Sequence, residues 1–119
     1  MKLNIRILHI RDAITRIEKA TENISYLDLS KNDILLRGIM YDIMIIGEAS
    51  KNVPEELKTN YAEIPWKNIS GTRDKLVHDC FDVDVDIIWN IISFELLKLK
   101  NAIIDYISKN PEIEELEKD

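Results

Sequence analysis

The sequence predicts an all-α protein, an up-and-down four-helix bundle with one extra short helix. Three observations favour this fold class: glycine and proline occur three times each, apolar residues recur at helical spacing, and no strand-turn-strand rhythm is present. With 45% hydrophobic and 32% charged residues, the 119-residue chain can build one core and remain soluble. We expect one helical domain over residues 1–110 and an acidic C-terminal tail over residues 111–119.

The first helix is predicted from an apolar stripe that fades at residues 21–23. The stripe advances in steps of four and three, as one face of a helix of about five turns does. Its members are Leu3, Ile7, Ile10, Ile14 and Ile17. We interpret Tyr26 to Lys31 as a connection to the next helix.

The second helix is predicted to start at Ser30 or Asn32, either of which can cap it, and to run to about Asn52. Pro54 prevents its continuation. Apolar residues cover most of its circumference: Leu35, Leu36, Ile39, Met40, Ile43, Met44 and Ile46. We therefore expect it to be buried on more than one side, in the bundle centre or in a subunit interface.

Two short elements are predicted next. Residues 54–57 open a helical turn, and Pro65 suits the first helical position of another. We expect Gly71 to separate that turn from a segment over residues 72–81. Trp66 is more typical of a core or interface aromatic residue than of a base-stacking platform.

The final helix is predicted to start at Asp84 or Asp86, since acids suit a helix N-terminus, and to end where Pro111 follows Asn110. Its main apolar stripe is Ile88, Ile92, Leu96, Leu99, Ile103 and Tyr106. A second apolar flank occurs only in its first half, at Ile87, Ile91, Phe94 and Leu97. This is more apolar surface than one antiparallel neighbour needs, so we expect a dimer.

Charge and cysteine content exclude several classes of protein. The net charge is −6, but residues 111–119 hold five acids and one lysine, so residues 1–110 carry only −2. Broad duplex binding is disfavoured, whereas a local basic cleft is compatible with this balance. A single cysteine excludes an internal disulfide, and no zinc-ligand spacing is present. With no apolar leader or membrane-length segment, we expect a cytoplasmic protein.

The segment over residues 64–84 holds the residues most suggestive of chemistry. On a helix, Arg73 and His78 lie about 140° apart, whereas Asp74 and His78 are one turn apart and adjacent. Two such helices facing each other across a two-fold axis would bring both pairs into one composite site. An arginine binds phosphate and a histidine moves a proton near neutral pH, which suffices for cleaving RNA through its own 2′-hydroxyl without metal. By spacing alone, however, a capping or salt-bridging pair on a helix surface explains these residues better.

The wider string is more specific than this spacing. It comprises Ile46-Gly47-Glu48-Ala49, Pro65-Trp66, Gly71, Arg73-Asp74, Leu76-Val77-His78 and Phe81-Asp82-Val83-Asp84. Together these residues resemble the HepT-like branch of the HEPN superfamily, whose signature is Arg, a polar residue, three more residues, His, any residue and Tyr. The resemblance covers nearly the whole chain. It implies a homodimer with the arginine and histidine at its interface, and a metal-independent endoribonuclease that is the toxin of a toxin–antitoxin pair.

The resemblance also implies roles for individual residues. Arg73 would bind the scissile phosphate, His78 would act as general acid or base, and Asp74 would fix His78 or an attacking group. Lys67 and Lys75 are candidate RNA-binding residues. The implied partners are a second copy of the chain, a minimal nucleotidyltransferase antitoxin, and transfer RNA or messenger RNA as substrate. No cofactor and no metal are expected.

Cys80 departs from the signature, which has tyrosine at this position. In the resembled systems that tyrosine receives a nucleotide from the partner, which silences the toxin. A thiol is a poor phosphate acceptor, so control by complex formation alone, modification of another residue and an inactive toxin all remain open.

Two other functions fit the sequence. The first is a non-catalytic nucleotide-binding or scaffolding module, in which Arg73 grips a mononucleotide phosphate and the bundle binds its nucleotidyltransferase. The acidic charge and the missing tyrosine favour it, whereas the intact Arg73, Asp74 and His78 favour the nuclease. The second, a plain helical oligomerisation domain, explains the apolar helices but not this set of residues.

Overall fold

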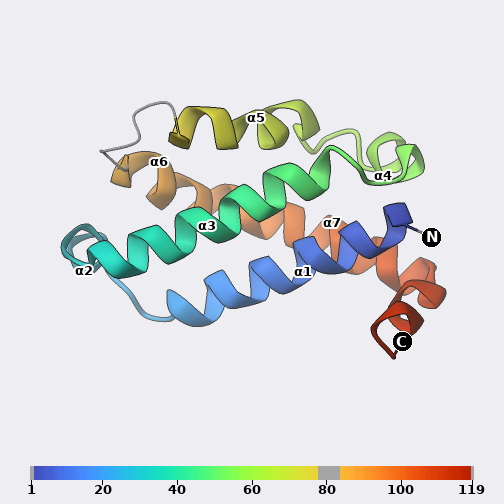
Figure 1. Ribbon diagram of the computed structural model, residues 1–119, viewed down its shortest axis with the longest axis horizontal. Coiled ribbons are helices and arrows are strands. Elements are labelled where there is room, and N and C mark those ends of the chain that lie inside the picture. The colour runs from blue at the N-terminus through green and yellow to red at the C-terminus, as the bar shows by residue number, and fades with distance from the viewer. Residues whose placement is uncertain (1, 78–83, 119) are drawn as a thin grey trace.

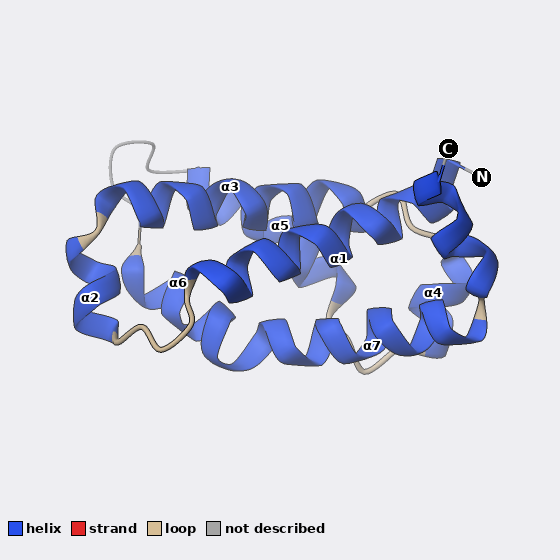
Figure 2. Cartoon of the chain, turned by 90° about the horizontal axis from the view of Figure 1, so that it is seen from below, coloured by secondary structure: helices blue, strands red, loops and turns tan. Residues whose placement is uncertain are grey.

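The computed structural model describes residues 2–77 and 84–118, and its regular elements there are all helical (Figure 2). In chain order they are α1 (Lys2–Ala20), α2 (Tyr26–Lys31), α3 (Asp33–Ser50), α4 (Glu55–Asn60), α5 (Trp66–Val77), α6 (Val85–Asn90), a π-helical turn (Ile91–Glu95), α7 (Leu96–Lys109) and a 3-10 helix (Pro111–Lys118). The predicted all-α fold class is confirmed. None of these described helices is long and apolar enough to cross a membrane.

The segments α1, α3, α5 and α6 with α7 run alternately up and down the long axis of the molecule (Figure 1). α1 and α3 lie side by side, α5 lies against α3, and α6 with α7 forms the layer behind them (Figures 1 and 2). The molecule measures 41 × 26 × 26 Å along its principal axes. The connection from α1 to α3 contains α2, and the connection from α3 to α5 contains α4.

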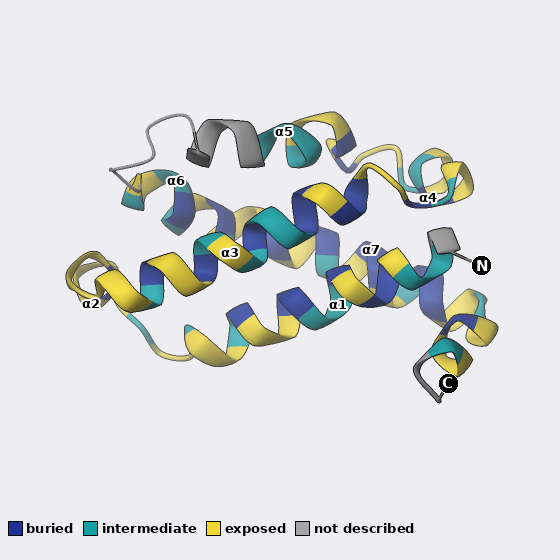
Figure 3. Ribbon diagram, in the orientation of Figure 1, coloured by how far each residue is buried: buried dark blue, intermediate teal, exposed yellow. Residues whose placement is uncertain are grey.

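The core forms where the apolar stripe of α1 meets α3. Buried and exposed residues alternate along both helices (Figure 3). The stripe predicted for the first helix is confirmed over the residues with described burial, none more than 2% exposed: Ile7, Ile10, Ile14 and Ile17. An ion pair between Arg16 and Asp42, 2.9 Å apart, links the same two helices at the rim. Because Arg16 is exposed there, the packed stripe rather than this pair stabilises the contact.

α3 is the central helix of the bundle. It packs against α1 on one side and α5 on another, so the prediction that it is buried on more than one side is confirmed. Its buried residues are Leu36, Ile39, Ile43, Ile46, Gly47, Ala49 and Ser50. Buried Ser50 satisfies its hydroxyl by donating to the carbonyl oxygen of Ile46 at 2.7 Å.

The prediction of a connection over Tyr26 to Lys31 is wrong, because these residues form helix α2. A capping box starts it: the Ser25 hydroxyl accepts from the Asp28 backbone N–H at 3.0 Å, and the Asp28 carboxylate accepts from the Ser25 N–H. Leu29, fully buried, holds the helix against the core. Of the two candidate caps for α3, Asn32 is confirmed, since its side-chain oxygen accepts from the Leu35 N–H at 3.0 Å.

Helix α5 runs through Gly71, so the predicted separation at this glycine is wrong. A glycine inside a helix costs only about 0.5–1 kcal/mol relative to alanine. The packing of α5 against α3 outweighs that cost, with Trp66 buried and Ile69 packed on the core. Pro65 precedes the first helical residue, and its carbonyl oxygen accepts from the Ile69 N–H at 3.0 Å. Trp66 is thus a core residue, as the sequence favoured.

The final helix begins as predicted but contains a π-helical turn that the sequence did not predict. Asp84 is its N-cap and accepts from the N–H groups of Asp86 and Ile87 at 3.0 and 3.2 Å. On an uninterrupted α-helix, the buried residues Ile88 and Leu96 would lie about 80° apart. The π turn takes up one extra residue and aligns them.

This turn also changes which residues of the final helix are buried. Ile91 is buried at 9% exposure and Ile92 is only half-buried, the reverse of the predicted stripe. Of the predicted second flank, Phe94 and Leu97 are 65% and 57% exposed. These two large apolar side chains of the predicted flank therefore face solvent.

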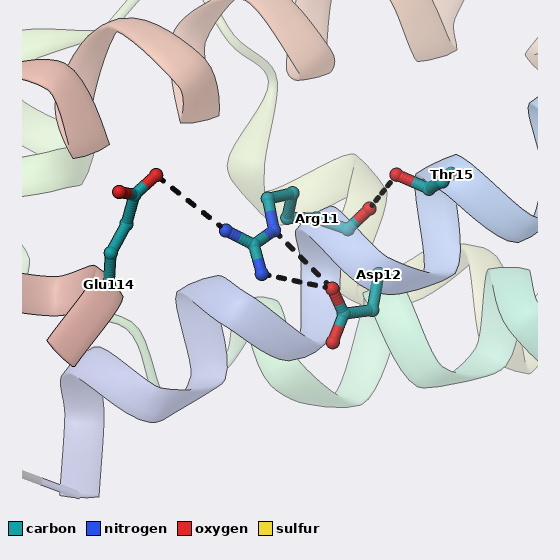
Figure 4. Close-up of polar contacts among 4 residues, drawn as sticks. All are labelled: Arg11, Asp12, Thr15 and Glu114. Atoms are coloured by element: carbon teal, nitrogen blue, oxygen red, sulfur yellow. Dashed lines mark hydrogen bonds and ion pairs between the residues drawn. The ribbon is translucent and has the colours of Figure 1, made fainter. Parts of the chain in front are cut away.

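The acidic C-terminal tail expected after Asn110 is a 3-10 helix that packs against α1. Ile113 is 1% exposed and belongs to the core. Figure 4 shows Arg11 of α1 between two carboxylates, 3.3 Å from Asp12 and 4.0 Å from Glu114 of the 3-10 helix. Thr15 donates to the Arg11 carbonyl oxygen at 3.0 Å. The domain boundary at residue 110 stays a prediction.

Candidate functional site

The predicted site residues belong to the C-terminal half of α5 and to the segment that follows it. The backbone of Arg73, Asp74 and Lys75 is helical, within Trp66–Val77. Their side chains are not among the described parts, and His78 and Cys80 lie outside the described residues. The contact predicted between Asp74 and His78 therefore stays a prediction. Lys67, in the first turn of α5, is exposed as a candidate RNA-binding side chain must be.

The N-terminal end of α5 is fixed by Trp66. Its indole N–H donates to the carbonyl oxygen of Tyr61 at 3.0 Å, while its ring and Ile64 are buried. Tyr61 in turn donates a short hydrogen bond to Asp105 of α7. The start of the helix that carries Arg73 is thereby tied to the opposite layer of the bundle.

Two tyrosines reinforce this tie between the α4 region and α7. Tyr61 and Tyr106 meet edge to face with ring centroids 6.2 Å apart, and Tyr106 donates to Glu56 of α4 at 2.9 Å. Burial, and then the hydrogen bonds to carboxylates, raise the pKa of each phenol to about 12. The hydrogen bond from Tyr61, followed by that from Lys109, lowers the pKa of Asp105. The phenols thus stay protonated donors across the neutral range.

A second cluster of contacts fixes the start of α6. Tyr26 of α2 donates to the carboxylate of Asp86, and this hydrogen bond is the main cause that raises the pKa of Tyr26. The rings of Tyr26 and Trp89 meet edge to face, 5.7 Å apart. Together with the Asp84 cap, these contacts hold the start of α6 on α2. The start of α6, directly after position 83, is therefore anchored to the bundle, and the start of α5 is anchored through Trp66.

One face of α5 is open in the described part of the chain. Lys67, Gly71 and Asp74 follow one another at steps of four and three residues and so share a helical face. A Cβ placed on Gly71 would meet no atom within 4 Å. Trp66 and Ile69 occupy the side that packs on the core. Among the described side chains, the face with Lys67 and Gly71 is thus accessible to a second molecule.

Sequence reasoning missed the cluster of Tyr26, Asp86 and Trp89. A signal for half of it was present, because Ser25 followed by Asp28 three residues later is a capping-box pattern that marks a helix start. Nothing in the sequence shows that α2 meets α6, since these residues are 60 positions apart. Among the described residues, no three His, Cys, Asp or Glu side chains group as metal ligands do.

The fold and the candidate site define an all-α up-and-down bundle with an arginine–aspartate pair on its third long helix, α5. Comparison with known proteins identifies the family. The profile of the Ribonuclease HepT-like family matches residues 10–106. The chain belongs to this HepT-like family of the HEPN superfamily.

Individual relatives agree with this assignment. The candidate RNase TTE0752 of Caldanaerobacter subterraneus subsp. tengcongensis is 36% identical over 101 residues, 85% of this chain and 90% of that protein. The candidate ribonuclease HepT of Thermococcus cleftensis is 37% identical over 91 residues, 76% of this chain and 83% of that protein. A candidate RNase of Methanocaldococcus jannaschii, MJ0127, is 33% identical over 99 residues, 83% and 74% of the two chains. No solved structure gives a significant match.

Proposed function

We propose that the protein is a metal-independent endoribonuclease and the toxin of a HEPN–nucleotidyltransferase toxin–antitoxin pair of type II or a type VII-like kind. One observation carries the proposal: a chain matched by the HepT-like ribonuclease family over residues 10–106 has Arg73, Asp74 and His78 at the signature positions. The names of the matched relatives support the ribonuclease part. The contacts that hold the starts of α5 and α6 are consistent with a site that must keep its groups in position.

The proposed reaction needs only the groups of this chain. The RNA 2′-oxygen attacks the adjacent phosphorus as the bond to the 5′-oxygen breaks. His78 takes the proton of the 2′-hydroxyl or delivers one to the departing oxygen, and Arg73 stabilises charge on the phosphorane oxygens. The products are a 2′,3′-cyclic phosphate and a 5′-hydroxyl.

A homodimer would complete this site. The open face of α5 with Lys67 and Gly71 leaves room for a second copy of the chain to pack against this helix. Exposed apolar side chains on α3 and in the final helix give such an assembly surface to bury, among them Ile34 at 85% exposure and Phe94 at 65%. The second partner is a minimal nucleotidyltransferase antitoxin.

Cys80 decides how that antitoxin acts on the protein. We expect no nucleotide on residue 80 after incubation with the nucleotidyltransferase and ATP, because a thiol replaces the phosphate-accepting phenol. Intact mass and peptide mapping by mass spectrometry measure this. A nucleotide adduct on Cys80 would contradict the expectation, and an adduct elsewhere would identify the substitute acceptor.

The alternative is a non-catalytic nucleotide-binding or scaffolding module that binds its nucleotidyltransferase. Two observations favour it, the net charge of −6 and the cysteine in place of tyrosine. In that case Arg73 holds a phosphate and His78 transfers no proton.

Cleavage of RNA in EDTA separates the two functions. Purified wild type, with its dimer confirmed, is incubated with transfer RNA and with messenger RNA, and the chain ends are analysed for cyclic phosphate. His78→Ala should lose about 10²- to 10⁴-fold in rate. His9→Ala is the matched control, because His9 is the chain's other histidine and lies exposed on α1. An unchanged rate in His78→Ala would refute the assignment, and no cleavage by the wild-type dimer would favour the binding module.

A further inference from the structure

A groove of about 670 Å³ lies beside α5. It lies between α5 and a wall made of α6, the π-helical turn and α7, because α5 packs along α3 and makes few contacts with that wall among the described residues. Ile43 and Ile46 of α3 line it, and half-buried Ile69 and Ile87 line it from α5 and α6. The groove is therefore apolar along its floor.

The groove is elongated. Its wall extends from Asp84 to Leu99, which at 1.5 Å per residue is roughly 20 Å of helix. About four turns of a further helix match that length. A trough of apolar side chains between two helices is the arrangement that receives the apolar face of an amphipathic helix.

The rim of the groove is acidic. Among the described residues, Glu63, Asp84, Asp86 and Glu95 line it together with one base, Lys98, which gives four negative charges against one positive there. In the described part of the chain, neither Glu63 nor Glu95 is paired with a basic side chain. Such a rim repels phosphate and disfavours RNA, whereas it attracts lysine and arginine.

We propose that this groove binds a basic amphipathic helix of a protein partner. The partner helix places apolar residues at i, i+3, i+4 and i+7 on the isoleucine floor, and its lysine or arginine side chains lie over Glu63 and Glu95. Its contacts also include Asn68 and Thr72 on the α5 side.

The groove and the open face of α5 are different surfaces of one helix. Asn68 and Thr72 line the groove. The open face with Lys67 and Gly71 lies about 100° away from them around the axis of α5. A helix bound in the groove leaves the face with Asp74 uncovered. The proposal therefore does not depend on whether the protein cleaves RNA.

Binding of designed peptides to the full-length protein tests the proposal. The probe is a fluorescein-labelled helical peptide of about four turns, with leucine on one stripe and lysine on the flanks, measured by fluorescence anisotropy. One control peptide has the same composition in scrambled order, and another has glutamate in place of lysine. We expect micromolar binding of the probe and at least roughly tenfold weaker binding of both controls.

Variants of the protein locate the binding surface. The double variant Glu63→Gln/Glu95→Gln should weaken probe binding about threefold to tenfold, because it removes two exposed charge pairs with the lysines of the probe. Asn68→Trp, which fills the groove, should weaken it at least roughly tenfold. The matched control is Glu22→Gln/Glu55→Gln, the same charge change at exposed positions outside the groove, and should leave binding unchanged. Circular dichroism and thermal melting confirm that each variant is folded.

Several results would overturn the proposal. Equal binding of the scrambled or acidic peptide would show non-specific adhesion, and binding unaffected by Asn68→Trp would place the probe elsewhere. No binding of any peptide, together with a changed association state of Asn68→Trp, would show that a second copy of the chain covers the groove. Binding of a labelled RNA oligonucleotide that Asn68→Trp abolishes would identify nucleic acid as the occupant.

Discussion

Replacing Gly71 by alanine tests the continuity of the helix that carries the candidate site. In the structure this glycine lies inside α5, and an added Cβ would meet no atom within 4 Å. Alanine restricts the unfolded chain and has the better helix propensity, so Gly71→Ala should stabilise the protein by about 0.5–1 kcal/mol. For a chain of this size that corresponds to a rise of about 2–6 °C in melting temperature.

The measurement is urea unfolding monitored by far-ultraviolet circular dichroism, at protein concentrations where self-association is constant. Gly38→Ala is the matched control, since Gly38 also lies inside a helix, α3, is exposed, and has no atom within 4 Å of an added Cβ. Both variants should gain similar stability. If Gly71 instead separated two elements with a left-handed backbone, alanine would destabilise the protein by more than that gain. A loss of stability in Gly71→Ala alone would refute the continuous helix.

Two further predictions concern the cap of α3 and the tyrosines of α4 and α7. Asn32→Ala should lower the free energy of unfolding by about 1 kcal/mol, because the N–H of Leu35 loses its acceptor; Ser30→Ala, whose hydroxyl donates only to the Leu27 carbonyl, should have a smaller effect, and equal losses in urea would contradict this. Because the pKa values of Tyr61 and Tyr106 are raised to about 12, their contribution to stability is present below pH 10 and is lost as the pH rises toward 12. The urea concentration at the unfolding midpoint, measured between pH 9 and 12, should fall less steeply with pH in Tyr61→Phe/Tyr106→Phe than in the wild type. An equal pH dependence in the two proteins would argue against the raised pKa values.

The long helices could be predicted because their apolar periodicity is a direct consequence of burial. Ile7, Ile10 and Ile14 repeat at helical steps and all are buried, and Asp84 caps the final helix as an acid at that position should. The helix α2 was missed because six residues with one buried leucine carry no periodic pattern, and its signal was the cap alone.

Two errors have a common physical cause, the dominance of packing over local preference. A break at Gly71 was predicted from the low helix propensity of glycine, which the packing of Trp66 and Ile69 overrides. The π turn was missed because a stripe drawn at α-helical steps through Ile88, Ile92 and Leu96 looked regular. Only the three-dimensional core shows that Ile91 is the buried residue.

The candidate site was likewise predictable only in part. The exposure of Lys67 could be predicted because lysine favours the solvated face of a helix, and the burial of Trp66 could be predicted because indole rings favour the core. The tie from Trp66 through Tyr61 to Asp105 could not be read from the sequence, because it depends on which helices meet. The roles of Arg73 and His78 come from the family signature and stay predictions.

The π turn over Ile91–Glu95 also bears on the length of the chain. Because it holds one residue more than an α-helical turn, removing one residue there would leave a plain α-helix in which the stripes before and after the turn keep their alignment. A single deletion at any of these positions should therefore be tolerated by the core, whereas the same deletion within α1 would rotate half of its stripe by about 100° out of the core. Relatives with one residue fewer in this turn can therefore keep the same bundle.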